Sequence, residues 1–183
     1  MQEVTVVIPN FNGMAYLDGV LSSLERQTIR NFEVILVDNG STDGSCAFVS
    51  AEYPWVHMIQ LPENYGFSRA VNEGIHAAHS PYVLLLNNDT EAEPDFLEEM
   101  VAALRRHKKA FSCQAKMIQL HDRDKMDDAG NYYCALGWAF ARGKGKDIRH
   151  YDREQKIFST CAGAAIYRKK FIDRIGDFDE EHF

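Results

Sequence analysis

Short apolar runs alternate with amphipathic segments through the first half of the chain. Four runs rich in β-branched and aliphatic residues predict buried strands, at 4–8 (stopped by Pro9), 33–37, 56–61 and 82–86. Between and after them, apolar residues recur at helical spacing and predict helices that include residues 17–24, 70–75 and 94–104. Apolar strands that alternate with helices indicate an α/β fold with a mainly parallel central sheet sandwiched by helices.

The pattern changes after about residue 111. Segments 113–120 and 157–167 predict further strands, and 169–175 predicts a short helix. The stretch 121–153 is polar and irregular, with four glycines. No repeat or linker divides the chain, so we expect one domain over residues 1–183.

Composition narrows the class of protein. The 183 residues can bury one sizeable core, and 45% hydrophobic content is typical of a soluble globular protein. A net charge of −7 disfavours nucleic acid as a partner. No apolar run could span a bilayer, and the start lacks the features of a signal peptide, so we expect a cytoplasmic protein. The four widely spaced cysteines could form two disulfides, but we favour buried free thiols.

Polar side chains follow three of the predicted strands. They are Asn10 and Asn12, then Asp38 and Asn39, then the triplet at 87–89. Because parallel strands place their carboxyl ends at one edge of the sheet, we expect these side chains to share a ligand site there.

Familiar phosphate-binding and hydrolase motifs are absent. The loop after the first strand has one glycine, and neither G-x-x-x-x-G-K-[ST] nor G-x-S-x-G occurs. Asp89, with Asn87 and Asn88 beside it, offers hard oxygen donors for a divalent cation that could hold a diphosphate. The alternative is that Asp89 and Thr90 cap the following helix.

Two further positions carry candidate contacts, each with a structural alternative. Asp38 and Asn39 could read the edge of a nucleobase, or could form an Asx turn completed by Gly40. Arg69 could approach a phosphate, or could be an ordinary surface arginine.

In combination, the motifs resemble those of family 2 glycosyltransferases, in particular the rhamnosyltransferase-like branch. The matching segments keep the family's order and cover nearly the whole chain, most weakly between 121 and 153. They are 6–13, 27–28, 37–45, 64–67, 70–75, 85–90, 161–165, 168–169 and 175–180.

The resemblance implies a GT-A fold, an inverting mechanism and a nucleotide-diphosphate sugar as donor. It also implies a Mg²⁺ or Mn²⁺ cofactor, held with the diphosphate by Asp89 in a D-x-D-like motif that here begins with Asn87. The other implied donor-site residues are Pro9, Asn10, Phe11, Asp38, Asn39, Asn64, Gly66, Arg69 and Asn88. The implied acceptor side contains Gly163, Ala164, Asp179 and Glu180.

An inverting transfer needs a carboxylate base to take the proton of the acceptor hydroxyl. In similar sequences that base follows the F-D-E motif, here 178–180, and we expect it beyond Phe183 in a longer enzyme. The alternative is a donor-binding fragment or non-catalytic GT-A module without efficient transfer. A sugar-1-phosphate nucleotidyltransferase is disfavoured, because the first loop carries no Lys or Arg.

The acceptor is expected to be a saccharide or a lipid-linked saccharide. Peripheral association with the inner face of the membrane is a further expectation. The basic run 105–109 predicts the solvated end of a helix, with contact to anionic lipid as the alternative. The oligomeric state is left open.

Overall fold

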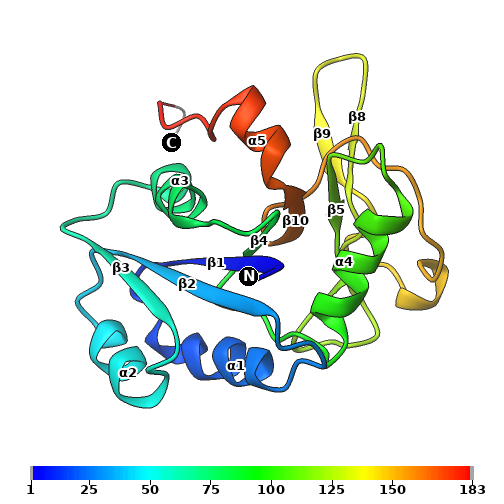
Figure 1. The fold of residues 1–183 in the computed structure, drawn as a ribbon. Helices are drawn as coiled ribbons and strands as arrows, with labels where there is room; N and C mark the ends of the chain where they lie inside the picture. Colours follow the sequence, from blue (N-terminus) through cyan, green and yellow to red (C-terminus); the bar gives the residue numbers. More distant parts are fainter. Residues whose placement is uncertain (1, 182–183) are drawn as a thin grey trace.

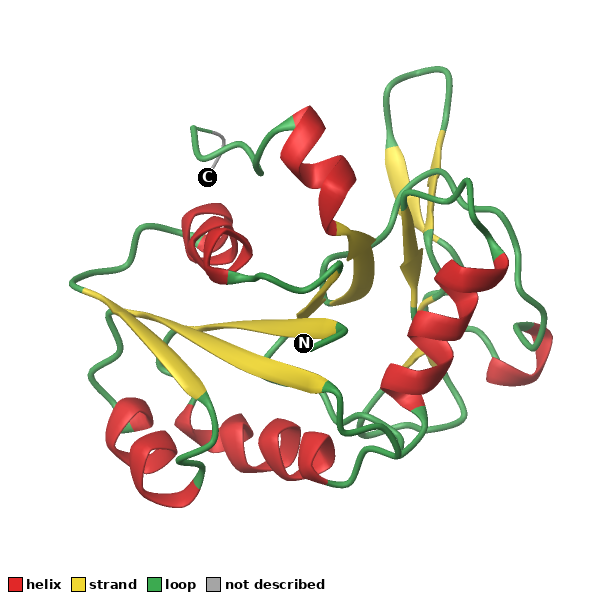
Figure 2. Cartoon of the chain, viewed as in Figure 1, coloured by secondary structure: helices red, strands yellow, loops and turns green. Residues whose placement is uncertain are grey.

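A six-stranded sheet forms the centre of the chain (Figures 1 and 2). The structure is a computed structural model that describes residues 2–181. The strand order is β3-β2-β1-β4-β10-β5, with β1 to β4 parallel and β10 antiparallel to both neighbours. The strands are β1 (Val4–Asn10), β2 (Phe32–Asn39), β3 (His57–Leu61), β4 (Tyr82–Leu86), β5 (Ser112–Gln114) and β10 (Ala164–Arg168).

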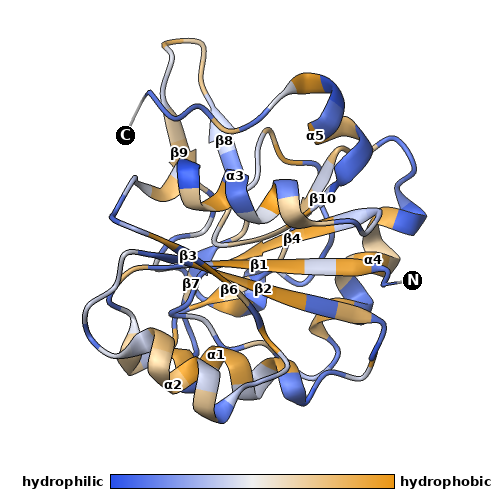
Figure 3. Ribbon diagram, turned by 60° about the vertical axis from the view of Figure 1, so that its left-hand side comes forward, coloured by the Kyte–Doolittle hydropathy of each residue, from blue (hydrophilic) through white to orange (hydrophobic). Residues whose placement is uncertain are grey.

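Helices cover both faces of this sheet, as the apolar strands predict. Alternation along β1 sends Val6 and Ile8 to one face, against α1 and α4, and Val7 to the other, against α3. Figure 3 shows the hydrophobic strands between these helical layers. The helices are α1 (Met14–Glu25), α2 (Ser45–Glu52), α3 (Phe67–Ala77), α4 (Phe96–Arg106) and α5 (Lys169–Ile175).

Strand β1 continues through Pro9, contrary to the prediction that this proline stops it. Pro9 is in register with Val37 of β2, whereas pairing with β4 ends at Val7. The proline therefore lies where β1 has only one neighbour, and the sheet does not need its missing N–H. The extension carries Asn10 to the edge where β2 ends in Asp38.

The second half departs further from the predicted elements. The predicted strand 113–120 divides into β5 and β6 (Met117–Ile118), which belong to different sheets. Strand β6 pairs with β7 (Met126–Asp128), and β8 (Asn131–Tyr133) pairs with β9 (Ala139–Ala141), all within or beside the segment predicted as irregular. A 3₁₀ turn, η1, spans Ile148–His150, and only the end of 157–167 becomes strand, as β10.

The thiols, the helices and the basic run can be compared with expectation. All four cysteines are free thiols, but each is partly exposed rather than buried. Among residues 2–181, none of the helices has the length and apolar character needed to cross a bilayer. The basic run lies at the end of α4, where the side chains of Arg105 and Arg106 are exposed and pair with Glu3 and Glu154.

Candidate functional site

The carboxyl ends of β1, β2 and β4 are joined by the side chain of Asn10. Its amide nitrogen donates to Asp38 Oδ1 at 2.9 Å and to Ser41 Oγ at 3.2 Å. Its amide oxygen accepts from Asn88 Nδ2 at 2.8 Å. Asn10 is only 1% exposed, so these bonds replace water almost completely. The structure thus brings together the three polar strand ends, as the sequence predicts.

Asp38 is a buried carboxylate held by several donors. Besides Asn10, the backbone N–H of Ser41 donates to Asp38 Oδ2 at 2.9 Å. Burial alone would raise the pKa of Asp38, but the hydrogen bonds from Ser41, Asn10 and Cys46 outweigh it and hold this pKa below its ordinary value. Asp38 is therefore ionised at neutral pH and brings negative charge to the edge of the sheet.

The loops after β1 and β2 are tied to each other. Ser41 Oγ accepts from the backbone N–H of Asn12 at 2.8 Å, and Asn12 Oδ1 accepts from the backbone N–H of Thr42 at 2.8 Å. Asp43 Oδ2 accepts from the backbone N–H of Met14 at the start of α1. Neither Ser41 nor Thr42 caps α2, because its N-cap residue is Gly44. The loop residues instead hold the two strand ends in register.

Gly13 allows the first loop to approach Asn10 and Asn88 closely. A Cβ atom on Gly13 would lie 2.1 Å from Asn88 Nδ2 and 2.3 Å from Asn10 Oδ1. Any other residue here would displace the two side chains that join β1 to β4.

Asn39 has a different task from Asp38. Its amide nitrogen donates to Asn64 Oδ1 at 2.8 Å and to the Gly66 carbonyl at 3.0 Å, and its oxygen accepts from the backbone N–H of Tyr65. With both amide hydrogens used and the side chain buried, Asn39 anchors the loop before α3. This geometry favours Asp38 over Asn39 for a contact to a base. Asn64 and Gly66 act in the same anchor, since Asn64 Oδ1 also accepts from the Gly66 N–H.

Asp89 lies at the end of β4 with its side chain exposed, next to Asn88 of the Asn10 network. It does not cap α4, whose N-cap residue is Asp95, and Thr90 instead donates to the Asn87 carbonyl at 2.7 Å. Within the described chain, no three His, Cys, Asp or Glu side chains are grouped so that they could hold a metal ion. One carboxylate with neighbouring amide oxygens suits Mg²⁺ or Mn²⁺ only if further oxygens come from a ligand.

Exposed groups adjoin this buried network. The ring of Phe11 is about half exposed immediately after β1, and Pro9 is partly exposed before it. Tyr65, in the loop before α3, is exposed to a similar extent. Aromatic faces of this kind can stack on a planar ring, whereas Asn10 and Asp38 have little surface left.

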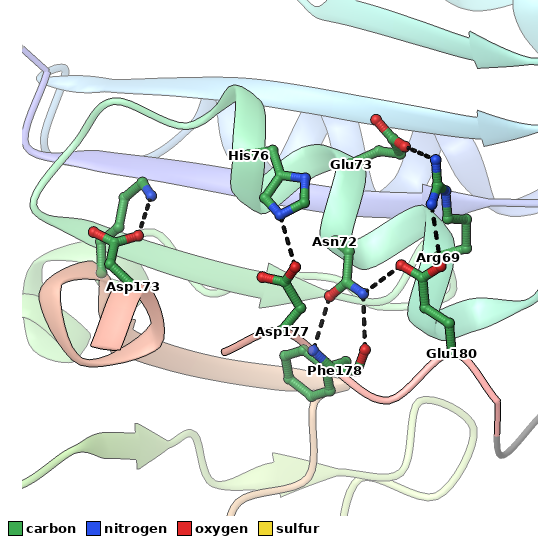
Figure 4. A network of polar contacts seen from close by, with 9 residues as sticks. Arg69, Asn72, Glu73, His76, Asp173, Asp177, Phe178 and Glu180 are labelled. Atoms are coloured by element: carbon green, nitrogen blue, oxygen red, sulfur yellow. Dashed lines mark hydrogen bonds and ion pairs between the residues drawn. The ribbon is translucent and has the colours of Figure 1, made fainter. Parts of the chain in front are cut away.

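Arg69 lies on α3 with both ends of its guanidinium paired (Figure 4). Its Nη2 atom is 2.7 Å from Glu73, and its Nη1 atom is 3.1 Å from Glu180. Arg69 and Glu180 line a pocket of about 560 Å³ with Leu61 and Tyr65. A phosphate contact by Arg69 stays a prediction, and it would require Arg69 to exchange a carboxylate for the phosphate.

Glu180 belongs to a C-terminal latch, residues 177–180, that lies along α3 (Figure 4). Buried Asn72 donates to the Phe178 carbonyl at 2.8 Å and to Glu180 Oε1 at 2.7 Å, and its oxygen accepts from the Phe178 N–H at 3.0 Å. His76 pairs with Asp177 at 2.9 Å. Hydrogen bonds from Asn72 and Arg69 lower the pKa of Glu180. Asp179, in the same latch, is exposed.

The predicted acceptor-side residues therefore fall into two places. Gly163 and Ala164 lie at the start of β10, where the Gly163 carbonyl accepts from the Asn87 N–H at 2.9 Å. Gly163 also lies close to the Asn87 side chain, since a Cβ atom there would be 3.3 Å from Nδ2. Asp179 and Glu180 lie in the latch on α3.

Sequence reasoning did not place two residues of this region. Ser41 contacts Asn10, Asn12 and Asp38, and its place in the matching segment 37–45 was the available signal. Asn72 lies in the matching segment 70–75, as a polar residue between the apolar positions 71 and 75 of a helix. Its partners are more than one hundred residues away, so its role is visible only in the fold.

A mainly parallel sheet flanked by helices, with polar side chains converging at its carboxyl edge, defines an α/β protein with a candidate ligand site at that edge. Residues 5–176 match the family model "Glycosyl transferase family 2". The chain belongs to that family, and the rhamnosyltransferase-like branch stays a prediction.

Curated relatives agree with this assignment. The chain is 31% identical over 133 residues to the glycosyltransferase GlyA of Streptococcus pneumoniae, covering 72% of the chain and 17% of GlyA. It is 26% identical over 182 residues to YwdF, an uncharacterized glycosyltransferase of Bacillus subtilis, covering 98% of the chain and 63% of YwdF. It is 30% identical over 95 residues to the teichoic acid poly(glycerol phosphate) polymerase of Staphylococcus epidermidis, covering 50% of the chain and 13% of that protein.

Solved structures confirm the GT-A fold. S. aureus TarS 1–349 in complex with UDP superposes with a TM-score of 0.71 at 22% identity, over 98% of the chain and 51% of TarS. The mannosyltransferase PcManGT of Pyrobaculum calidifontis, in complex with GDP-Man and Mn²⁺, gives 0.68 at 18% identity, over 98% of the chain and 48% of PcManGT. The chain thus spans only part of each of these proteins.

Proposed function

We propose that the chain is the donor-binding part of an inverting glycosyltransferase that transfers a hexosyl group from a nucleotide-diphosphate sugar. The observation that carries the proposal is the Asn10 network, which joins the ends of β1, β2 and β4 in a chain of this family. The TarS and PcManGT complexes, which hold UDP and GDP-Man, support a nucleotide sugar as the ligand.

The nucleotide end of the donor is assigned to the edge formed by β1 and β2. Phe11 offers an exposed ring face for stacking, and Pro9 adds apolar surface beside it. Asp38 is only 2% exposed, but each of its carboxylate oxygens has acceptor capacity beyond the bonds from Asn10 and Ser41, and we assign it to accept from an N–H or hydroxyl of the ligand. The amide group of Asn10 is fully hydrogen-bonded within the protein, so Asn10 positions Asp38 rather than contacting the ligand.

The diphosphate is assigned to the end of β4. Asp89, with the amide oxygens of Asn87 and Asn88, would hold Mg²⁺ or Mn²⁺ together with phosphate oxygens. When bound, the cation would stabilise the negative charge that develops on the leaving diphosphate. The Mn²⁺ of the PcManGT complex supports this choice of cofactor.

The acceptor is assigned to the side of the sheet where Gly163 and Ala164 begin β10, beside Asn87. We propose a saccharide or lipid-linked saccharide of cell-wall polysaccharide synthesis, which the name of the teichoic acid polymerase supports. No residue among 2–181 is assigned as the base that takes the proton of the acceptor hydroxyl.

Isothermal titration calorimetry with UDP, dTDP and GDP, with and without Mn²⁺, tests the donor site. We expect metal-dependent binding of at least one nucleotide, weakened about tenfold or more by Asp89→Asn because a charge-assisted contact is lost. The matched control is Asp95→Asn, which makes the same charge change on the same β4–α4 connection, away from the strand end.

Three results would be informative. Folded protein that binds none of the nucleotides contradicts the proposal, as does an Asp89→Asn variant that binds like the Asp95→Asn control. Nucleotide-sugar binding without transfer to any saccharide acceptor favours the second function, a donor-binding module without efficient transfer.

A further inference from the structure

The hairpin formed by β8 and β9 exposes aromatic rings on both of its faces. Tyr132 and Phe140 are opposite each other in the register, with ring centroids 5.8 Å apart. On the other face Tyr133 stacks on Phe158, with centroids 5.0 Å apart and planes inclined by 16°. All four side chains are exposed, and residues 131–141 include no charged residue. An antiparallel hairpin in water normally presents one polar face.

The tip of this hairpin is a hydrogen-bonded loop that projects from the body of the molecule (Figure 1). The Gly137 N–H donates to the Cys134 carbonyl at 3.0 Å, and the Cys134 N–H donates to the Trp138 carbonyl at 2.9 Å. Gly137 has φ +89°, which suits the bulged turn of a short hairpin loop. The loop presents Leu136 and Trp138, which are 85% and 74% exposed.

The segment after the hairpin is basic, although the whole chain is acidic. Residues 142–156 contain six Lys and Arg against three Asp and Glu, whereas the chain has a net charge of −7. The three carboxylates, Asp147, Asp152 and Glu154, are each paired with a cation of the chain. Two of the six cations are also paired, Arg149 with Asp147 and Lys144 with Asp127, and the count of six against three leaves the segment with a positive surplus that suits an anionic surface.

Space for headgroups is present beside these cations. A hollow of about 1280 Å³ opens between the end of α4 and the segment after the hairpin. Arg142, Arg153 and Lys156 contribute to its lining, and so does Phe158, whose ring stacks on the hairpin. Apolar rings and cations thus meet on one side of the molecule.

We infer that the β8–β9 hairpin docks the protein on an anionic lipid bilayer, with Leu136 and Trp138 inserted at the interface and the cations of 142–156 against the headgroups. Tyr and Trp are the side chains that favour the membrane–water interface, and a basic rim strengthens binding to anionic lipid. The inference rests on the proposed function only in naming a lipid-linked acceptor as the reason for docking.

The position of the hairpin relates this surface to the candidate site. The N–H of Asn131, at the base of β8, donates to the Ser159 carbonyl at 2.9 Å. Four residues later Gly163 bonds to Asn87, at the end of β4. Docking through the hairpin would therefore bring the proposed acceptor side toward the bilayer, where a lipid-linked saccharide would lie.

The chain has only two tryptophans, which allows a direct test. Trp55→Phe leaves Trp138 as the sole tryptophan, and Trp138→Phe leaves Trp55, whose indole N–H is bonded to Glu25. The probe is a vesicle of equimolar phosphatidylcholine and phosphatidylglycerol. With it, we expect the tryptophan fluorescence of Trp55→Phe to shift to the blue and to be quenched by brominated lipid, whereas the fluorescence of Trp138→Phe should not change. Vesicles of phosphatidylcholine alone should give a weaker effect.

Vesicle cosedimentation of two variants measures how much the apolar tip and the basic segment each contribute to membrane binding. Leu136→Ser should weaken partitioning about tenfold because it removes apolar burial, and Lys146→Gln about fivefold because it removes one cation. Both should leave nucleotide binding unchanged, so failure of docking and failure of the proposed donor site are distinguishable. Folded Trp55→Phe protein whose emission does not respond to vesicles overturns the inference. The inference is also overturned if sedimentation velocity shows that the protein self-associates and thereby buries Trp138. It is equally overturned if only a soluble saccharide, and no vesicle, shifts the Trp138 emission.

Discussion

Asn10 joins three strand ends, and its replacement gives a quantitative test of that role. Asn10→Ala removes two donated hydrogen bonds, to Asp38 and Ser41, and one accepted from Asn88. At about 1 kcal/mol for each hydrogen bond of a buried group, we expect the free energy of unfolding to fall by about 3 kcal/mol.

Asn10→Asp keeps the shape of the side chain but reverses the pH dependence of the free energy of unfolding. In the native protein the pKa of Asp38 is lowered, so its contribution to stability is complete above the ordinary Asp pKa and is lost as pH falls through the lowered value. In Asn10→Asp two carboxylates would meet where a donor now lies 2.9 Å from Asp38, which raises the pKa of the pair. This variant should therefore lose more stability than Asn10→Ala at about pH 7, and the difference should narrow toward about pH 5 as the pair takes up a proton.

Urea denaturation followed by circular dichroism at both pH values measures these losses. The control is Asn31→Ala, an exposed asparagine before β2 whose side chain makes no hydrogen bond within residues 2–181, and its effect should be within about 0.5 kcal/mol. If Asn10→Ala loses less than about 1 kcal/mol with an unchanged m-value, the network does not hold the strand ends together. If Asn10→Asp and Asn10→Ala respond alike to pH, the assigned state of Asp38 is wrong.

Two further predictions concern close packing and thiol reactivity. Gly74→Ala should destabilise the protein by about 1–3 kcal/mol, because its Cβ atom would lie 2.2 Å from Val7 Cγ1 where α3 crosses β1. Gly19→Ala, within α1 and with its nearest neighbouring atom at 3.5 Å, should instead stabilise by about 0.5–1 kcal/mol in the same urea titration, and equal effects of the two changes would contradict this packing. Burial, together with Asp38, raises the pKa of Cys46 to about 11, so this thiol should react with iodoacetamide roughly a hundredfold more slowly than an ordinary thiol at about pH 8. Peptide mapping by mass spectrometry checks the rate, and labelling of Cys46 as fast as Cys134 would refute the raised pKa of this partly buried, hydrogen-bonded thiol.

The parallel half of the sheet could be predicted because its signals are local. The strand Tyr82–Leu86 has the predicted bounds, and the polar strand ends converge as expected. In the second half, the short helix Lys169–Ile175 also has the predicted bounds. In these segments the hydrophobic period and the flanking turn residues determine the element, and parallel strands require one shared edge.

The second half could not be predicted in the same way, because distant partners decide its structure. The apolar pattern of 113–120 does not show that its two ends join different sheets. Likewise, 157–163 has strand-like composition, yet only Ala164–Arg168 finds partners on both sides, β4 and β5. The β8–β9 hairpin likewise forms within the stretch predicted as polar and irregular, and its aromatic rings remain exposed.

The position of β10 has a consequence for how the protein is made. This strand lies between β4 and β5, yet it leaves the ribosome almost eighty residues after β4. At usual rates of synthesis, the apolar strand Tyr82–Leu86 waits roughly 4–16 s with one edge unpaired. During this interval the nascent chain offers a template for intermolecular strand pairing. Slow codons between the two strands would prolong the exposure and favour inclusion bodies, whereas a holdase that covers β4 would raise the yield of native protein.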